Sequence, residues 1–219
     1  MGRADHTSEG RAGSLTLVAG DLALNFANTE SGRGGGHHLN HLKSAQDVLS
    51  WAQHAHVITT AAAQQGYRLV EDRRAVAEKI FQGAVSLRSA IYDINSAFVA
   101  GRKPDETSLK VLAGQHCETL GSAKLVQQGA RYAWAWSCDD DLAAAVLGPI
   151  AEAAVNLLTR QDRSRIKQCA GNHCGWLFFD ATKNNSRCWC DMSVCGNRSK
   201  IKAMRTRKRQ AGLESRSAP

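Results

Sequence analysis

Five of the seven cysteines lie between residues 169 and 195, and their spacing constrains the fold of this segment more than any other feature. They include two pairs with four residues between the members, and fifteen residues separate the pairs. Zinc requires four soft ligands in a tetrahedron, and two short loops of paired cysteines supply them. Four thiolates also close the coordination sphere, so a single, structural Zn²⁺ is expected. The predicted ligands are Cys169, Cys174, Cys190 and Cys195.

The same segment leaves two alternatives open. Cys188 lies two residues before Cys190 and competes with it as a ligand, although the equal spacing within the pairs favours Cys190. Buried free cysteines are the alternative to a metal site, whereas an odd number of cysteines fits poorly with a disulfide framework. The apolar run 176–179 predicts a strand of a hairpin that covers the metal.

Positive charge is concentrated in the same part of the chain. Residues 160–219 contain fourteen Lys or Arg and four Asp or Glu, whereas residues 1–159 contain fourteen and sixteen. Such asymmetry indicates a segment that binds a polyanion. On a helix beginning near Asn197, a row of cations falls on one face. Ile201 and Met204 fall on another, where we expect them to pack against the zinc module.

Lysine and arginine side chains bind phosphates, and guanidinium groups also reach guanine edges in the major groove. The row is therefore predicted to bind double-stranded DNA, with Lys183 and Arg187 adding phosphate contacts from the hairpin. One alternative is a solvated basic tail. Another is an RNA-binding or ribosome-associated zinc protein, because phosphate contacts do not distinguish the polymers. The predicted row comprises Arg198, Lys202, Arg205 and Arg209.

Apolar periodicity predicts a mainly helical domain over residues 15–160. The longest stripe recurs at steps of three and four from about Glu71 to Ala100, and Gly101 ends it. Pro149 is expected to kink the last helix of this domain. The other predicted helices cover about 20–28, 44–56, 59–65, 105–118 and 139–160.

Two alternating segments around Gln128-Gly129 predict a β-hairpin, in which Trp134 and Trp136 are expected to be core residues. The fold class is therefore α+β: a mainly helical domain with a small antiparallel hairpin, then a zinc-bound module over 161–210 with a hairpin and a basic helix. Residues 1–14 and 211–219 are expected to be disordered. No signal peptide precedes the domain, and no run approaches the ~20 apolar residues of a membrane span, so a cytoplasmic protein is expected.

A ligand site in the first domain is suggested by Asn25, Asn28 and Arg33, which could hold a small polar or anionic effector. The alternative is that the asparagines cap helices or satisfy backbone groups. The glycine- and histidine-rich segment 31–41 is expected to be a flexible loop. No set of catalytic partners stands out, so an enzyme is not expected. The competing view is an N-terminal active site with a merely structural zinc tail.

The C-terminal segment resembles the CGNR zinc-finger family of bacterial proteins, whose name is spelled by Cys195-Gly196-Asn197-Arg198. Further residues of this segment also resemble the family's pattern: Phe178, Asp180, Thr182, Lys183, Asn184, Trp189 and Cys190. Cys188 is a departure, because the family usually carries arginine there. Upstream, the sequence LALNFANT at 22–29 and the long helices resemble the ABATE domain that precedes this module.

The resemblance implies a stress-responsive transcription regulator with a sensing N-terminal domain and a DNA-binding tail. A small-molecule effector would bind the first domain and modulate DNA binding. A homodimer is compatible with this role, although no heptad repeat marks a dimer seam.

Overall fold

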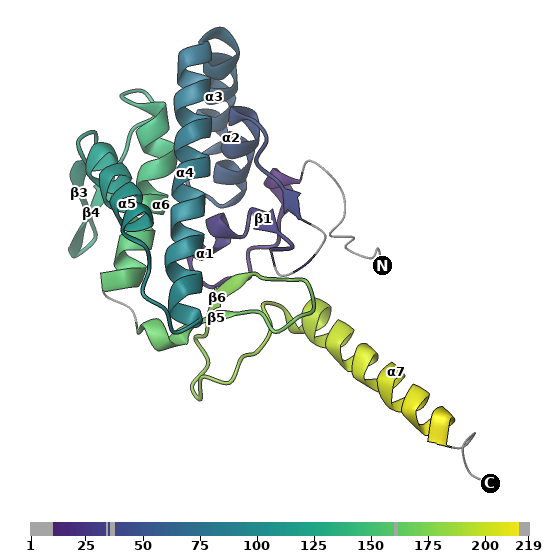
Figure 1. The fold of residues 1–219 in the computed structure, drawn as a ribbon. Coiled ribbons are helices and arrows are strands. Elements are labelled where there is room, and N and C mark those ends of the chain that lie inside the picture. Colours follow the sequence, from purple (N-terminus) through teal and green to yellow (C-terminus); the bar gives the residue numbers. More distant parts are fainter. Residues whose placement is uncertain (1–10, 34, 36–37, 160–161, 215–219) are drawn as a thin grey trace.

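The computed structural model describes residues 11–33, 35, 38–159 and 162–214, and its larger part is a bundle of helices (Figure 1). The central helix α4 contacts α1, α2, α3, α5 and α6, and α6 also packs on α1 and α5. The bundle helices are α1 (Leu22–Ala27), α2 (Ala45–His54), α3 (Thr60–Asp72), α4 (Arg74–Val99), α5 (Glu106–Leu120) and α6 (Leu142–Thr159).

Short polar side chains start most of these helices, as their sequences predict. Asp21, Ser44, Thr59 and Asp105 each accept a hydrogen bond from a backbone N–H in the first turn that follows. These contacts satisfy donors that the helix itself leaves unpaired. They also fix where α1, α2, α3 and α5 begin.

The apolar stripe of α4 is buried along its length, which confirms the periodicity that predicted this helix. Its start was predicted too early, because Arg73 adopts extended backbone (φ −125°, ψ 91°) and separates α3 from α4. Helix α3, which was predicted over about 59–65, is correspondingly longer than expected and runs to Asp72. The buried apolar residues of α4 include Ile80, Ala84, Leu87, Ile91 and Ile94.

Helix α6 has the length and composition to cross a bilayer, with a mean hydropathy of 1.6 over 18 residues. The sequence was expected to contain no such run. In the structure 61% of this window is buried inside the protein, where Val146, Ile150 and Leu157 join the hydrophobic core. Its apolar character is thus explained by its place between α1, α4 and α5.

Within the described residues, three two-stranded antiparallel sheets complete the fold and confirm the α+β class. The first, β1 (Glu30–Ser31) with β2 (Leu39–Asn40), lies where a flexible loop was expected. The second, β3 (Lys124–Gln128) with β4 (Arg131–Ala135), is the predicted hairpin. The third, β5 (Ile166–Gln168) with β6 (Leu177–Phe179), belongs to the cysteine-rich segment.

The two hairpin tryptophans have different environments. Trp136 is half-buried, and its indole Nε1 donates to the carbonyl of Thr119 at 2.8 Å, as suits a core position. Trp134 is 41% exposed and Tyr132 is 66% exposed, so the expectation that Trp134 is core was wrong. Alternation placed both residues on one face of the hairpin, but Trp136 lies just beyond the end of β4, where it packs against Gly148 of α6.

Both ends of the described chain are more regular than predicted. Residues Ala12–Ser14 form a 3₁₀ turn, and Ala12 is buried against the core, whereas disorder was expected up to residue 14. The C-terminal helix α7 (Asn197–Glu214) continues through residues 211–214, which were also expected to be disordered. Residues 1–10 and 215–219 lie outside the described part of the chain.

Candidate metal centre and nucleic-acid interface

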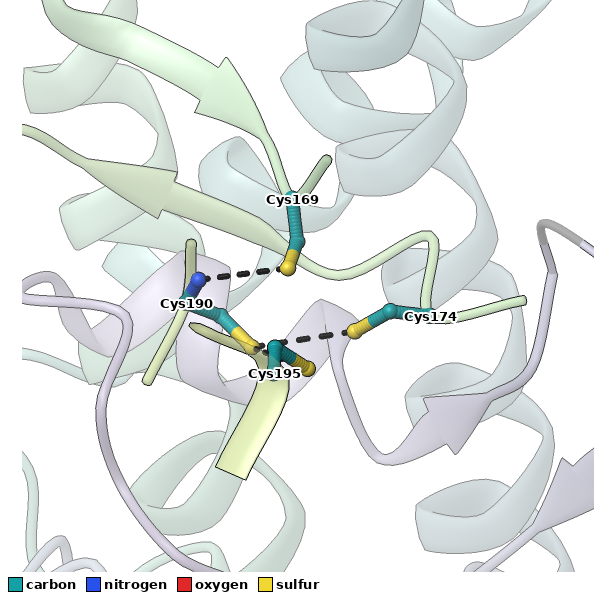
Figure 2. A group of neighbouring side chains, drawn as sticks. All are labelled: Cys169, Cys174, Cys190 and Cys195. Carbon is teal, nitrogen blue, oxygen red and sulfur yellow. Dashed lines mark hydrogen bonds between the residues drawn. The ribbon is translucent and has the colours of Figure 1, made fainter. Parts of the chain in front are cut away.

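Four cysteine side chains from the segment 169–195 point toward a common centre (Figure 2). Their sulfur atoms all lie within 4.8 Å of one another. The Sγ atom of Cys190 is 3.6 Å from that of Cys174 and 3.7 Å from that of Cys195. A tetrahedral zinc with Zn–S bonds of about 2.3 Å requires sulfur separations of about 3.8 Å. The distances thus fit one zinc ion and are far too long for disulfides.

Backbone geometry prepares these loops for thiolate ligands. The N–H groups of Gly171 and Cys190 point at the Sγ atom of Cys169, at 3.4 and 3.3 Å. Such donors stabilise negative charge on sulfur and orient the ligand. Gly175 has a φ of +73°, and a Cβ at Gly171 would lie 3.0 Å from the Sγ of Cys195. Glycine therefore suits both places, where a side chain would strain the backbone or crowd a ligand sulfur.

The thiols perturb one another strongly, as expected for a ligand set. Hydrogen bonds with Cys174, Cys190 and Cys195 lower the pKa of Cys169. The hydrogen bond between Cys174 and Cys169 raises the pKa of Cys174. A divalent ion at the centre offsets the repulsion among four thiolates.

Cys188 lies outside this ligand set. Its side chain is exposed, and its Sγ donates to the carbonyl of Ser186 at 3.4 Å. Its backbone nevertheless braces the centre, because its carbonyl accepts from Ala170 N–H at 3.0 Å. The open choice between Cys188 and Cys190 is thus decided in favour of Cys190, whose side chain is buried.

A buried carboxylate organises the loop between the cysteine pairs. Asp180 is fully buried, and it accepts hydrogen bonds from Lys167 Nζ at 2.7 Å, from Thr182 Oγ1 at 2.6 Å and from the backbone N–H of Arg187 at 2.8 Å. Burial alone would raise the pKa of Asp180, but these hydrogen bonds hold it well below its usual range. Lys183 is carried on this loop, where its side chain is exposed.

Helix α7 leaves the rest of the molecule as a single projecting rod (Figure 1). A π-helical turn, Met192–Gly196, precedes it, and Trp189 Nε1 donates to Ser199 Oγ at 3.2 Å near its first turn. Ile201 is 47% exposed and Met204 is 53% exposed, so the expectation that they pack against the zinc module was wrong. The helix extends beyond the module, and nothing in the described chain lies beside these two side chains.

The cationic side chains that the structure describes on α7 are solvent-exposed. Among the described residues none of them takes part in a salt bridge, and from Asn197 to Leu213 the helix contains no Asp or Glu. At 100° per residue Arg198, Lys202 and Arg205 fall on one face, as predicted. Arg209 follows in the same row, but its side chain lies outside the described part. The exposed cations are Arg198, Lys200, Lys202, Arg205, Arg207 and Lys208.

Two family models match the chain. Residues 165–208 match the CGNR zinc finger, which agrees with the four-cysteine centre and the helix that follows it. Residues 20–161, more than half of the chain, match ABATE, described as "Putative stress-induced transcription regulator". The chain belongs to the ABATE family. A search of curated proteins finds no match to it.

Within this ABATE–CGNR chain, the side chain of Arg187, a predicted phosphate contact, makes several contacts inside the protein. Its Nε donates to the carbonyl of Trp189 at 2.9 Å, and its NH2 group donates to the carbonyls of Val18, at 2.7 Å, and Cys190. Its guanidinium also lies 4.4 Å from the ring centroid of Phe178. These contacts occupy the side chain, which holds the second cysteine loop against the N-terminal segment.

The predicted ligand residues Asn25 and Asn28 satisfy backbone groups, which was the alternative to a ligand site. Asn28 is buried, and it pairs with Leu177 of β6 in both directions, through Nδ2 to the carbonyl at 2.8 Å and Oδ1 from the N–H at 3.0 Å. Asn25 Oδ1 accepts from Ala19 N–H at 2.9 Å. Asn28 thus joins the helical domain to the zinc module as a neighbouring strand would.

Arg33 lies apart from these asparagines. It contacts Glu30 and stacks on the ring of Tyr92, 3.9 Å from the centroid. The hydroxyl of Tyr92 donates to the carbonyl of Gly175, beside the zinc ligand Cys174, at 3.0 Å. Sequence reasoning missed Tyr92, because a tyrosine within an apolar helical stripe gives no sign of a polar partner 83 residues away.

Proposed function

We propose that this protein is a DNA-binding transcription regulator that contacts duplex DNA with helix α7. The observation that carries the proposal is an exposed helix whose only charged side chains before Glu214 are cations. At 1.5 Å per residue its 18 residues extend about 27 Å. A helix of that size fits the major groove of B-DNA, where its cations meet phosphates on both sides and guanine edges on the floor.

In this proposal some residues contact DNA and others hold the structure. Arg198, Lys202 and Arg205 face the DNA as a row, continued by Arg209, and Lys183 adds a phosphate contact from the loop before the second cysteine pair. A zinc ion held by the four cysteines supplies rigidity to the base of the helix and no chemistry. Asp180 and Arg187 position the loop and do not touch DNA.

The proposal includes a cytoplasmic location in a bacterial cell, where reducing conditions keep cysteines available for zinc. The helical domain would modulate DNA binding in response to a small molecule, and catalysis is not part of the role. A homodimer stays a prediction. Two copies would place two α7 helices on one DNA, as dimeric regulators do at paired half-sites.

The test measures affinity for duplex DNA by fluorescence anisotropy across a range of salt concentrations. Each phosphate contact contributes about 0.9 to the slope of log K against log salt. The triple variant Arg198→Ala/Lys202→Ala/Arg205→Ala should therefore lower the slope by about 3 and weaken binding strongly. The matched control, Arg68→Ala/Arg102→Ala/Arg131→Ala, removes three cations from the helical domain and should bind like the wild type.

An RNA arm decides the class of nucleic acid. The same titration with a folded RNA hairpin should give weaker binding than duplex DNA at equal salt, because the deep, narrow groove of A-form RNA does not admit a helix. Equal slopes for the triple variant and its control, or a clear preference for RNA, would overturn the proposal.

A further inference from the structure

Two arginines of the helical domain, one buried and one half-buried, contact the same carboxylate. Arg88 on α4 has a side chain only 4% exposed, and its NH2 group lies 3.2 Å from Glu30 Oε2. Arg33, 16% exposed, contacts the same oxygen atom. A buried guanidinium requires a counter-charge, which Glu30 supplies to both arginines. The exposed carboxylate of Asp93 adds a second negative charge that acts on Arg33.

The hydrogen-bond donors of this group exceed the acceptors that the described residues offer. Arg88 NH1 donates to Asn40 Oδ1 at 2.6 Å, but the Nε atoms of Arg33 and Arg88 are both buried and have no acceptor among the described residues. Buried donors without partners are rare in folded proteins, and a bound anion is one way in which such donors are satisfied. Burial lowers the pKa of Arg88, Glu30 opposes this effect, and the charge of Arg33 adds to it.

We propose that Arg33 and Arg88 form a binding site for a small oxyanion, a carboxylate or phosphate group, and that Glu30 occupies this site when the ligand is absent. Guanidinium groups present pairs of N–H donors that match such oxygens. The ligand would displace the Glu30 side chain and supply acceptors to the unpaired Nε atoms. It would enter past His38, whose side chain is 55% exposed and whose Nε2 lies 2.5 Å from Glu30 Oε1.

The site is connected to the metal centre by direct contacts. Arg33 stacks on Tyr92, whose hydroxyl donates to Gly175 in the first cysteine loop and accepts from Gln168 Nε2 at 2.9 Å. The backbone of Gly35 also abuts that loop, because a Cβ there would lie 1.9 Å from His173 Nδ1. A ligand that moved Arg33 would therefore act on the base of α7. This regulatory step, unlike the anion site itself, rests on the proposed function.

Thermal unfolding of the zinc-loaded full-length protein tests the site without DNA. Inorganic phosphate and succinate, each against sodium chloride at equal ionic strength, should raise the Tm as a bound ligand does. The arm with the larger shift identifies phosphate or carboxylate as the ligand chemistry. Glu30→Gln should bind the preferred anion about tenfold more tightly, because the internal competitor for the guanidinium donors is lost. Arg88→Met should abolish the shift, and Arg102→Met, an exposed control, should keep it.

The gain in Glu30→Gln is the deciding result, because a variant that merely fails to fold cannot bind more tightly. If neither anion stabilises Glu30→Gln more than the wild type, or if Arg88→Met folds and keeps the shift, the anion site is overturned. DNA affinity is then measured with and without the preferred anion. Anion binding that leaves DNA affinity unchanged overturns only the coupling, and a protein that binds the anion but no DNA overturns only the proposed function.

Discussion

The cysteine-rich segment 162–196 and the helix α7 that follows it are adjacent in sequence but are held in opposite ways. The first is fastened to the helical domain by buried hydrogen bonds through Asn28 and Tyr92 and by a partly buried one through Arg187. The second is exposed at every described side chain from residue 197 to 208, apart from a half-buried Ser199. Because α7 is exposed, packing on the domain adds little to its stability. An isolated helix of this length is itself only marginally stable in water.

The difference separates basic residues that stabilise the fold from those free to bind a partner. Arg165, Lys167 and Arg187 all direct their charged groups to backbone carbonyls or to Asp180. Arg198 and Arg205 have no such partner among the described residues. The net charge of the segment therefore overstates the charge available for DNA. Four experiments, in order of decreasing effect, test this division.

Removal of the metal should have the largest effect. Zinc binding contributes about 10–16 kcal/mol in small structural sites, so Cys195→Ser or a strong chelator should unfold the segment 162–196. DNA binding should be lost, whereas the helical domain should keep most of its far-ultraviolet circular dichroism. Cys117→Ser, in an exposed position on α5, is the matched control and should retain one zinc per chain.

Zinc quantitation and proteolysis around residues 162–196 measure this outcome. If the metal-free protein keeps this segment protected from protease, zinc is not required to fold it. The contacts to the helical domain would then be sufficient by themselves to fold the segment.

Loss of Asn28 should have the next largest effect. Asn28→Ala leaves both the N–H and the carbonyl of Leu177 buried without partners, which costs about 2–4 kcal/mol of unfolding free energy. Denaturant unfolding measures the loss. Asn25→Ala is the control, because Asn25 accepts one hydrogen bond from Ala19 and is only partly buried. Equal losses of unfolding free energy in the two variants would show that the hydrogen bonds of Asn28 to Leu177 do not stabilise the protein more than that of Asn25.

The sequence allowed the zinc ligands and the long helices to be predicted, because each depends on local spacing. Four cysteines in two short loops have few other uses, and the stripe from Ile80 to Ile94 is a property of one helix. The fold class followed from the same periodicities.

The tertiary partners could not be predicted in this way. Asn28 meets Leu177 across 149 residues, and one of the carbonyls that accept from Arg187, that of Val18, lies 169 residues away. An arginine in the positively charged part of the chain gives the same local signal whether its side chain is exposed, as at Arg205, or held by carbonyls, as at Arg187. The exposure of Ile201 and Met204 was missed for the related reason that amphipathic spacing does not say whether a partner surface exists.

Substitution of Arg187 and of Arg205 should separate stability from DNA binding. Arg187→Ala removes three hydrogen bonds to carbonyls and should cost about 2–3 kcal/mol of stability. Arg205→Ala should leave stability within about 0.5 kcal/mol of the wild type and lower the salt slope of DNA binding by about 1. Anisotropy titration and thermal unfolding on both variants give the two readouts. A salt slope that falls for Arg187→Ala while its stability holds would place that arginine on DNA.

The smallest effect is expected from Ala203→Gly, in the middle of α7. Glycine lowers the stability of an exposed helix by about 1 kcal/mol, and α7 has no packed surface to compensate. If α7 is only partly helical in the absence of DNA, it must become helical on binding. The added cost of about 1 kcal/mol then lowers DNA affinity about fivefold. The Tm of the helical domain should not change, because Ala203 is exposed. Ala203→Ser is a milder control, which should lie between the wild type and glycine in DNA affinity. A lowered Tm in Ala203→Gly would mean that α7 contributes to the fold of the domain, and the division between a fastened segment and a free helix would then be wrong.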